Sequence, residues 1–138
     1  MSWDIFVQDF PKELKSVTDI PNDYRPKAIG RRSEIIAKIL QVVPGADFSD
    51  PSWGIIGGDD WSIEVNLGSD GILDGFAFHV RGGDAAAGVV AAILDHLELR
   101  AVETGNGDFF EAGPNAIDAF RKWRAFRDRV INSDQKGG

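Results

Sequence analysis

Residues 61–97 constrain the fold more than any other part of the chain. From residue 61 to residue 67, apolar side chains alternate with polar ones, which is the pattern of a strand with one buried face. Residues 68–71 read Gly-Ser-Asp-Gly, a composition that favours a turn. A second alternating segment follows, and residues 85–97 carry branched apolar side chains at helical spacing. We therefore expect an antiparallel hairpin that packs against a helix.

The alternation also predicts a register for this hairpin. Pairing the two strands around a four-residue turn places Ile63 opposite Phe76, so that the apolar faces of the strands coincide. A slip of one residue would turn one apolar set to the wrong side of the sheet. In this register His79 lies nearer to Asp60 than to Glu64, although all three belong to the region of the polar face.

The remaining elements follow from the same patterns. We predict further strands over residues 3–9, 53–56, 100–103 and 108–110, helices over 31–43 and 116–131, a long proline-containing connection over 11–30, and a loop over 44–52. The expected fold is an α+β domain with an antiparallel sheet of five or six strands and about three helices mainly on one face. The order is β-α-β-β-β-α-β-β-α. We expect residues 1–131 to form a single globular domain and residues 132–138 to form a flexible C-terminal tail.

The composition excludes several kinds of site. The chain has no cysteine, which rules out disulfides, thiolate zinc sites and a cysteine nucleophile and favours a reducing compartment. With only two histidines, a histidine-rich metal centre is also excluded, and we expect no cofactor. The first residues lack the basic and apolar regions of a signal peptide. No apolar run approaches the roughly 20 residues of a membrane span, so we expect a cytoplasmic protein with no membrane contact.

Charge is distributed unevenly along the chain. Residues 1–114 hold 19 acidic and 9 basic residues, whereas residues 115–138 hold 3 acidic and 6 basic residues. Because phosphate contacts dominate affinity for nucleic acids, the acidic body argues against nucleic-acid binding. It favours a basic protein partner, although acidity that merely keeps the protein in solution is the plainer interpretation. The basic stretch 116–131 can meet the acidic body of its own chain.

The polar face of the hairpin is the candidate binding site. We expect Glu64, Asn66, His79 and Arg81 to lie on it, because these residues alternate with the apolar set. A histidine beside a carboxylate can transfer protons near neutral pH, which favours catalysis or ligand binding. An ordinary exposed face accounts for the same residues, and the nucleophile motif Gly-x-Ser-x-Gly is not present.

Residues 82–84, Gly-Gly-Asp, stand between a predicted strand and a predicted helix. Backbone amides at a helix N-terminus attract anions, so this turn resembles a phosphate-binding turn. Neither Gly-x-Gly-x-x-Gly nor a Walker-type motif accompanies it, and the Asp84 carboxylate would itself occupy the anion position. We therefore predict a structural role, with Asp84 as the N-cap of the helix.

Three segments carry a resemblance to known proteins: W-D-I-F-V at residues 3–7, S-I-E-V-N-L-G at 62–68 and F-H-V-R-G-G-D at 78–84. With these segments the chain resembles a family of small, single-domain, uncharacterised bacterial proteins. The resemblance implies no established activity and assigns no catalytic residue. In size, acidity and expected open sheet face, the chain is also similar to immunity proteins of bacterial toxin systems.

These observations favour a non-enzymatic, acidic, intracellular domain that binds a basic protein. An immunity protein against a basic toxin is the concrete form of this hypothesis. The alternative is a small enzyme or small-molecule binder that uses Glu64, His79 and Arg81. A third possibility is a homo-oligomer subunit that associates through exposed aromatic residues.

Overall fold

The structure, a computed structural model, describes residues 3–58, 60–82, 84–103 and 108–110. Its helices are α1 (Arg32–Val42) and α2 (Asp84–Leu97), with a short 3₁₀ helix at Val17–Asp19. Its strands are β1 (Trp3–Gln8), β2 (Gly30–Arg31), β3 (Asp47–Asp50), β4 (Trp53–Gly57), β5 (Ser62–Asn66), β6 (Ile72–Leu73), β7 (Gly75–Arg81), β8 (Arg100–Glu103) and β9 (Asp108–Phe110).

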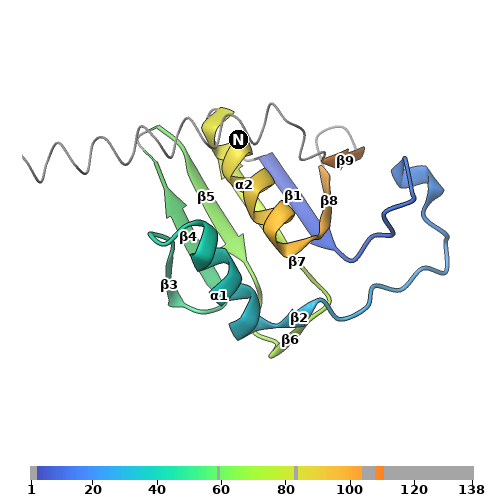
Figure 1. Cartoon of the computed structure of the whole chain (residues 1–138), viewed down its shortest axis with the longest axis horizontal. Coiled ribbons are helices and arrows are strands. Elements are labelled where there is room, and N and C mark those ends of the chain that lie inside the picture. The colour runs from blue at the N-terminus through green and yellow to red at the C-terminus, as the bar shows by residue number, and fades with distance from the viewer. Residues whose placement is uncertain (1–2, 59, 83, 104–107, 111–138) are drawn as a thin grey trace, which may run out of the picture.

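Seven of these strands form one sheet with the order β3-β4-β5-β7-β1-β8-β9. Every neighbouring pair is antiparallel, and β2 and β6 form a separate two-stranded antiparallel sheet. Helices α1 and α2 contact each other and cross the same face of the large sheet (Figure 1). Among the described residues, no helix covers the opposite face, which we call the open face. Neither described helix is long and apolar enough to cross a membrane.

The predicted α+β class and antiparallel sheet are confirmed, but the predicted strand count is too low. The main sheet has seven strands rather than five or six, and β2 and β6 add a second sheet. Two-residue strands have no periodicity to detect, and β3 reads Asp-Phe-Ser-Asp, which is a turn-like composition within the predicted loop 44–52. The predicted helix 116–131 and tail 132–138 lie outside the described residues.

The predicted hairpin register is wrong. Ile63 lies opposite Val80 rather than Phe76, and Val65 lies opposite Phe78. The error is four residues, and because side chains alternate with a period of two, the residues of β5 and β7 keep their predicted faces. The cause is the connection 67–74, which is not a tight turn. The Leu67 amide donates to the Ser52 carbonyl at 3.0 Å, and β6 within this connection pairs with β2.

The core lies between the sheet and the two helices. Alternate residues of the central strands point into it, and one face of each helix meets them. Its members with no more than 2% exposure include Ile5, Val7, Ile63, Val65 and Phe78 from the sheet and Ile35, Ile39, Val89, Val90 and Ile93 from the helices. The intervening residues of the same strands therefore point to the open face, which places the candidate site there.

The long connection between β1 and β2 is fastened to the sheet by two side chains. The Nη1 atom of Arg100 donates to the carbonyls of Pro11 and Leu14, at 2.7 Å in both cases. Its guanidinium lies 3.7 Å from the centre of the Phe109 ring. Further along, the Tyr24 hydroxyl donates to Asp9, with the backbone carbonyl at 3.0 Å. Tyr24 thus ties this connection to the residue that follows β1.

Arg100→Met is expected to release this connection, because methionine keeps an apolar stem but donates no hydrogen bond. Two bonds from a charged group are lost, so we expect the locally open population to rise about tenfold or more. Trypsin should then cut after Lys12 and Lys15 faster, as followed by mass spectrometry. Arg25→Met is the control, since Arg25 is exposed on the same connection. Equal cleavage rates for the two variants would contradict this role of Arg100.

Tyr24 offers a direct test by titration, because it is the only tyrosine in the chain. Burial, together with its hydrogen bond to Asp9, raises the pKa of Tyr24 from 10.0 to about 12. The stabilisation that it provides is therefore complete below pH 10 and is lost as the pH rises through about 12. Absorbance at the tyrosinate band should show this late midpoint in the folded protein. Asp9→Asn should move the midpoint down, and an unchanged midpoint would show that Asp9 has no part in it.

Helix α2 ends in a Schellman motif. The Leu99 amide donates to the Leu94 carbonyl at 3.1 Å, and the Glu98 amide donates to the Asp95 carbonyl at 3.2 Å. Glu98 has a φ of 56°, in the left-handed region where glycine is favoured. Glu98→Gly should therefore raise the free energy of unfolding by about 0.5–1 kcal/mol in urea denaturation. Glu98→Ala removes the same charge but keeps the strain, so it should give little or no gain.

Candidate functional site: the open face of the sheet

The register of the large sheet arranges the side chains of the open face in rows. Directly paired residues of antiparallel strands point to the same face and lie close together. One row consists of Phe6 on β1, Ala77 on β7, Asn66 on β5 and Trp53 on β4. We call these four residues the aromatic row, because Phe6 and Trp53 are aromatic; the register continues the row to Val102 on β8 and to Asp50 on β3.

The next row along the strands carries charge. It consists of Asp4 on β1, His79 on β7, Glu64 on β5 and Ile55 on β4, and we call it the charged row. Arg81 follows two residues after His79 on β7, so it lies on the same face. The two rows bring together residues from strands that are far apart in the sequence.

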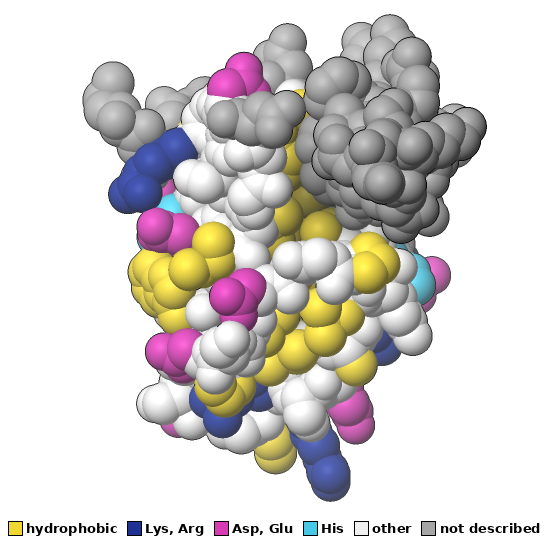
Figure 2. All heavy atoms as spheres, turned by 90° about the vertical axis from the view of Figure 1, so that its left-hand side faces the viewer, with side chains coloured by type: hydrophobic (Ala, Val, Ile, Leu, Met, Phe, Trp, Pro, Cys, Tyr) yellow, Lys and Arg dark blue, Asp and Glu magenta, His cyan; other side chains and the backbone are white. Residues whose placement is uncertain are grey.

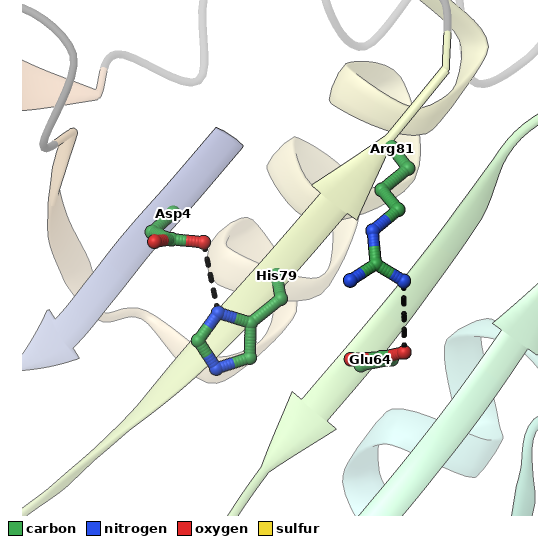
Figure 3. A network of polar contacts seen from close by, with 4 residues as sticks. All are labelled: Asp4, Glu64, His79 and Arg81. Atoms are coloured by element: carbon green, nitrogen blue, oxygen red, sulfur yellow. Dashed lines mark hydrogen bonds and ion pairs between the residues drawn. The ribbon is translucent and has the colours of Figure 1, made fainter. Parts of the chain in front are cut away.

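Two polar contacts join these residues in pairs, one within the charged row and one between the row and Arg81 (Figure 3). The Nδ1 atom of His79 lies 2.8 Å from Oδ1 of Asp4, and Nη1 of Arg81 donates to Oε1 of Glu64 at 3.2 Å. The side chains of His79 and Glu64 are 23% and 27% exposed, whereas that of Arg81 is 57% exposed. Both contacts are therefore accessible from solvent, although the side chains of His79 and Glu64 are partly shielded.

Trp53 connects the two rows. Its ring stacks on the His79 ring, with the centroids 5.8 Å apart and an angle of 21° between the planes. Since β5 lies between the strands of these two residues, the indole reaches across β5 to make this contact. His79 is thus held on one side by Asp4 and on its ring face by Trp53.

All four residues of the predicted site point to the open face, but their partners differ from the prediction. His79 lies directly opposite Glu64 in the register, not nearer to Asp60, and its hydrogen bond goes to Asp4 instead. Glu64 binds Arg81. The alternation in β1 already indicates that Asp4 and Phe6 point away from the core. No sequence signal indicates that β1 lies beside β7, so Asp4 was missed as a partner of His79.

Large apolar side chains are exposed on the same face. Among the described residues, four large hydrophobic side chains are exposed: Phe6 (47%), Trp53 (36%), Ile55 (49%) and Ile72 (63%). The first three belong to the aromatic and charged rows. Figure 2 looks from the side of β3 and β4 and shows hydrophobic, acidic, basic and histidine side chains close together along one border of the molecule. The open face therefore combines apolar contact area with paired charges.

A hollow opens beside the aromatic row. It has a volume of about 340 Å³, and its lining includes Phe6, Gln8, Asn66, Gly75 and Ala77. Ala77 is the smallest member of the aromatic row, so the depression lies between the larger side chains on either side. A second hollow of about 620 Å³ lies between the connection at Lys12–Lys15, the end of α2 and β9. Its lining shares no residue with that of the first hollow.

The outer strand β3 places two carboxylates, those of Asp47 and Asp50, next to the open face, and the pKa of each is lowered. Asp47 lies opposite Ile55 in the register, and its carboxylate accepts from the hydroxyl of Ser49 at 2.6 Å and from the Ser49 amide at 2.9 Å. These bonds lower the pKa of Asp47. Matching bonds from Ser52 lower the pKa of Asp50. The same bonds occupy backbone amides at this sheet edge, which makes it a poorer template for another strand.

Two ion pairs of the open face involve one histidine, one arginine and two carboxylates. Among the described residues, no group of three histidine or acidic side chains could hold a metal ion. His96 belongs to α2, on the other side of the sheet, and its Nε2 atom lies 2.8 Å from Oε1 of Gln41. At His79, one ring nitrogen faces Asp4, and Figure 3 shows the other pointing away from it. This second ring nitrogen is free of Asp4 and can exchange a proton. The two carboxylates of the charged row are paired with His79 and Arg81.

The glycine turn before α2 is explained by packing. Gly82 has a φ of 105°, and a Cβ atom there would lie 2.3 Å from Cβ of Trp61. Glycine is therefore required by backbone conformation and by the close approach of Cα and Cβ of Trp61, without any bound anion. Helix α2 begins at Asp84 itself, and the side chain of Asp84 lies outside the described part of the structure, so its capping role stays a prediction.

No protein-family model, curated protein or solved structure matches the chain. The resemblance to a family of small bacterial proteins and to immunity proteins accordingly stays a prediction, and the open face is interpreted from its own geometry.

Proposed function

We propose that the protein is a non-enzymatic, acidic protein-binding domain of the cytoplasm, and that the open face is its binding surface. One observation carries this proposal: three of the four large hydrophobic side chains exposed in the described residues stand on this one face. Aromatic anchors surrounded by polar groups are typical of the energetically important centre of protein interfaces. A sheet covered on one face only is a natural place for such a surface.

The paired charges fit the same role. Glu64 is paired with Arg81 and Asp4 with His79, so a partner can cover these groups without leaving an isolated buried charge. The acidic excess over residues 1–114 and the aspartates of β3 favour a basic partner through long-range attraction. An immunity protein that neutralises a basic toxin is the concrete form of this proposal.

Affinity capture from the native host tests the proposal. The wild-type chain should retain a basic protein that Phe6→Ala/Trp53→Ala does not retain and that elevated salt releases. Ile72→Ala is the matched control, because Ile72 is exposed on the separate β2–β6 sheet. A captured protein that is indifferent to the double substitution, or equal loss with Ile72→Ala, would refute the open face as the binding surface.

A second candidate is a small enzyme or small-molecule binder that uses Glu64, His79 and Arg81. The observation that favours it is the 2.8 Å contact between His79 and Asp4, because a carboxylate that orients one ring nitrogen leaves the other available as a general base. The hollow beside the aromatic row offers space for a ligand. A substrate screen in which His79→Ala abolishes turnover would favour this candidate over the binding domain.

A further inference from the structure

We propose that the hollow beside the aromatic row is an anchor site for one cationic side chain, arginine above all, of a basic partner segment. The inference rests on the proposed function, since it specifies which chemical group the open face recognises. Of the four predicted site residues, Asn66 belongs to the lining of this hollow and the other three do not.

The size of the hollow indicates a single side chain. Small-molecule sites commonly have volumes of about 300–1,000 Å³, and the hollow of about 340 Å³ is at the lower end. Its floor is formed where two small residues, Gly75 and Ala77, follow each other on the outward side of β7. An added Cβ at Gly75 would lie 2.6 Å from the carbonyl oxygen of Val7, so close strand packing keeps this position small.

The walls favour a long side chain with an apolar stem and a charged end. Phe6, which is 47% exposed and belongs to the lining, offers the face or edge of its ring. Aromatic rings attract guanidinium and ammonium groups, and the stem of an arginine packs against apolar surface. The side-chain amides of Gln8 and Asn66 on the lining offer carbonyl oxygens to a cationic donor.

Two carboxylates stand near the hollow, and one cation, the Arg32 guanidinium, contacts its lining through the Gly68 carbonyl at 3.0 Å. Glu64 is two residues from Asn66 on β5, and Asp4 is two residues from Phe6 on β1, so both carboxylates stand one row away. The partner of Glu64, Arg81, is 57% exposed and holds it by one bond of 3.2 Å, which leaves carboxylate capacity for a second guanidinium. An acidic side chain would meet these carboxylates and be repelled, and a purely apolar one would leave the amides without a partner.

Short peptides test this assignment without knowledge of the partner. The probes are acetyl-Gly-Gly-X-Gly-Gly-amide peptides with X as arginine, norleucine or glutamate, titrated into the ¹⁵N-labelled full chain and followed through backbone amide shifts. The arginine peptide should shift the amides of Phe6, Asn66 and Ala77 and bind at least about fivefold more tightly than the other two. Ala77→Leu should fill the hollow and weaken the arginine peptide about tenfold or more, and Glu64→Gln should weaken it about threefold.

Ile72→Ala should leave peptide binding unchanged, and Phe6→Ala replaces Ala77→Leu if the larger residue prevents folding. Equal binding of the norleucine peptide, tighter binding of the glutamate peptide, or shifts that lie outside the hollow would overturn the assignment. The absence of shifts at the hollow with any peptide would do so as well. Capture of a basic partner that Phe6→Ala/Trp53→Ala abolishes, but Ala77→Leu does not, would refute the anchor site and leave the proposed function standing.

Discussion

Gly82→Ala is expected to lower the free energy of unfolding by about 3–5 kcal/mol, since two costs add at this residue. The first is conformational, because a φ of 105° is strained for any residue with a Cβ atom. The second is steric: the new methyl group would lie 2.3 Å from Cβ and 2.5 Å from Cα of Trp61, and 2.6 Å from the Asp60 carbonyl oxygen. None of these atoms belongs to a flexible side-chain end, so the backbone itself would have to move.

Urea denaturation followed by tryptophan fluorescence measures this effect. Gly57→Ala is the matched control, because Gly57 lies in β4 and an added Cβ there would meet no atom within 4 Å. We expect the control to change the stability by less than about 1 kcal/mol. A loss at Gly82 no greater than that at Gly57 would show that the turn before α2 is not packed as tightly as the structure has it.

Phe78→Ala is the second substitution with a large expected effect. Phe78 is fully buried, is among the largest core side chains, and packs edge-on against Phe76 with the ring centroids 5.1 Å apart. Truncation of such a side chain removes its apolar burial and leaves a cavity, at a cost of about 3–5 kcal/mol. Because Phe78 stands between Ala77 and His79 on β7, the same change should loosen the strand that presents the centre of the open face.

Phe6→Ala is the control that separates the two faces of the sheet. Phe6 is 47% exposed on the open face, so its truncation should cost less than about 1 kcal/mol in the same urea experiment. If the proposed function holds, this variant is stable but impaired in binding, whereas Phe78→Ala loses stability first. Similar stability losses for the two phenylalanines would contradict the assignment of Phe6 to an uncovered face.

Local patterns predicted most of the elements of the fold. The apolar spacing that predicts a helix over 31–43 corresponds to α1 at Arg32–Val42, and the strand predicted at 100–103 is β8. The short strands β2 and β6 were missed, because each has two residues and exists only through pairing with the other. The hairpin register was missed for a related reason: contacts of residues 67–74 with β2 and with Ser52 set the length of the connection.

The candidate site was predicted as a face but not as a set of contacts. Alternation alone assigns Glu64, Asn66, His79 and Arg81 to the polar side of their strands, and the structure places them there. It cannot indicate which carboxylate meets which cation. That depends on register and strand order, so Asp4, which is 75 residues from His79 in the chain, becomes its partner.

The sequence by itself determined the α+β class, the two faces of each central strand and the acidic character of the body, because these follow from composition and from a period of two or 3.6 residues. Only the tertiary structure decided that β1 lies between β7 and β8 and that Trp53 reaches across β5 to His79. The physical reason is that strand order is set by how the whole apolar surface is buried, which no local pattern contains. The aromatic row, the charged row and the hollow beside them are consequences of that order.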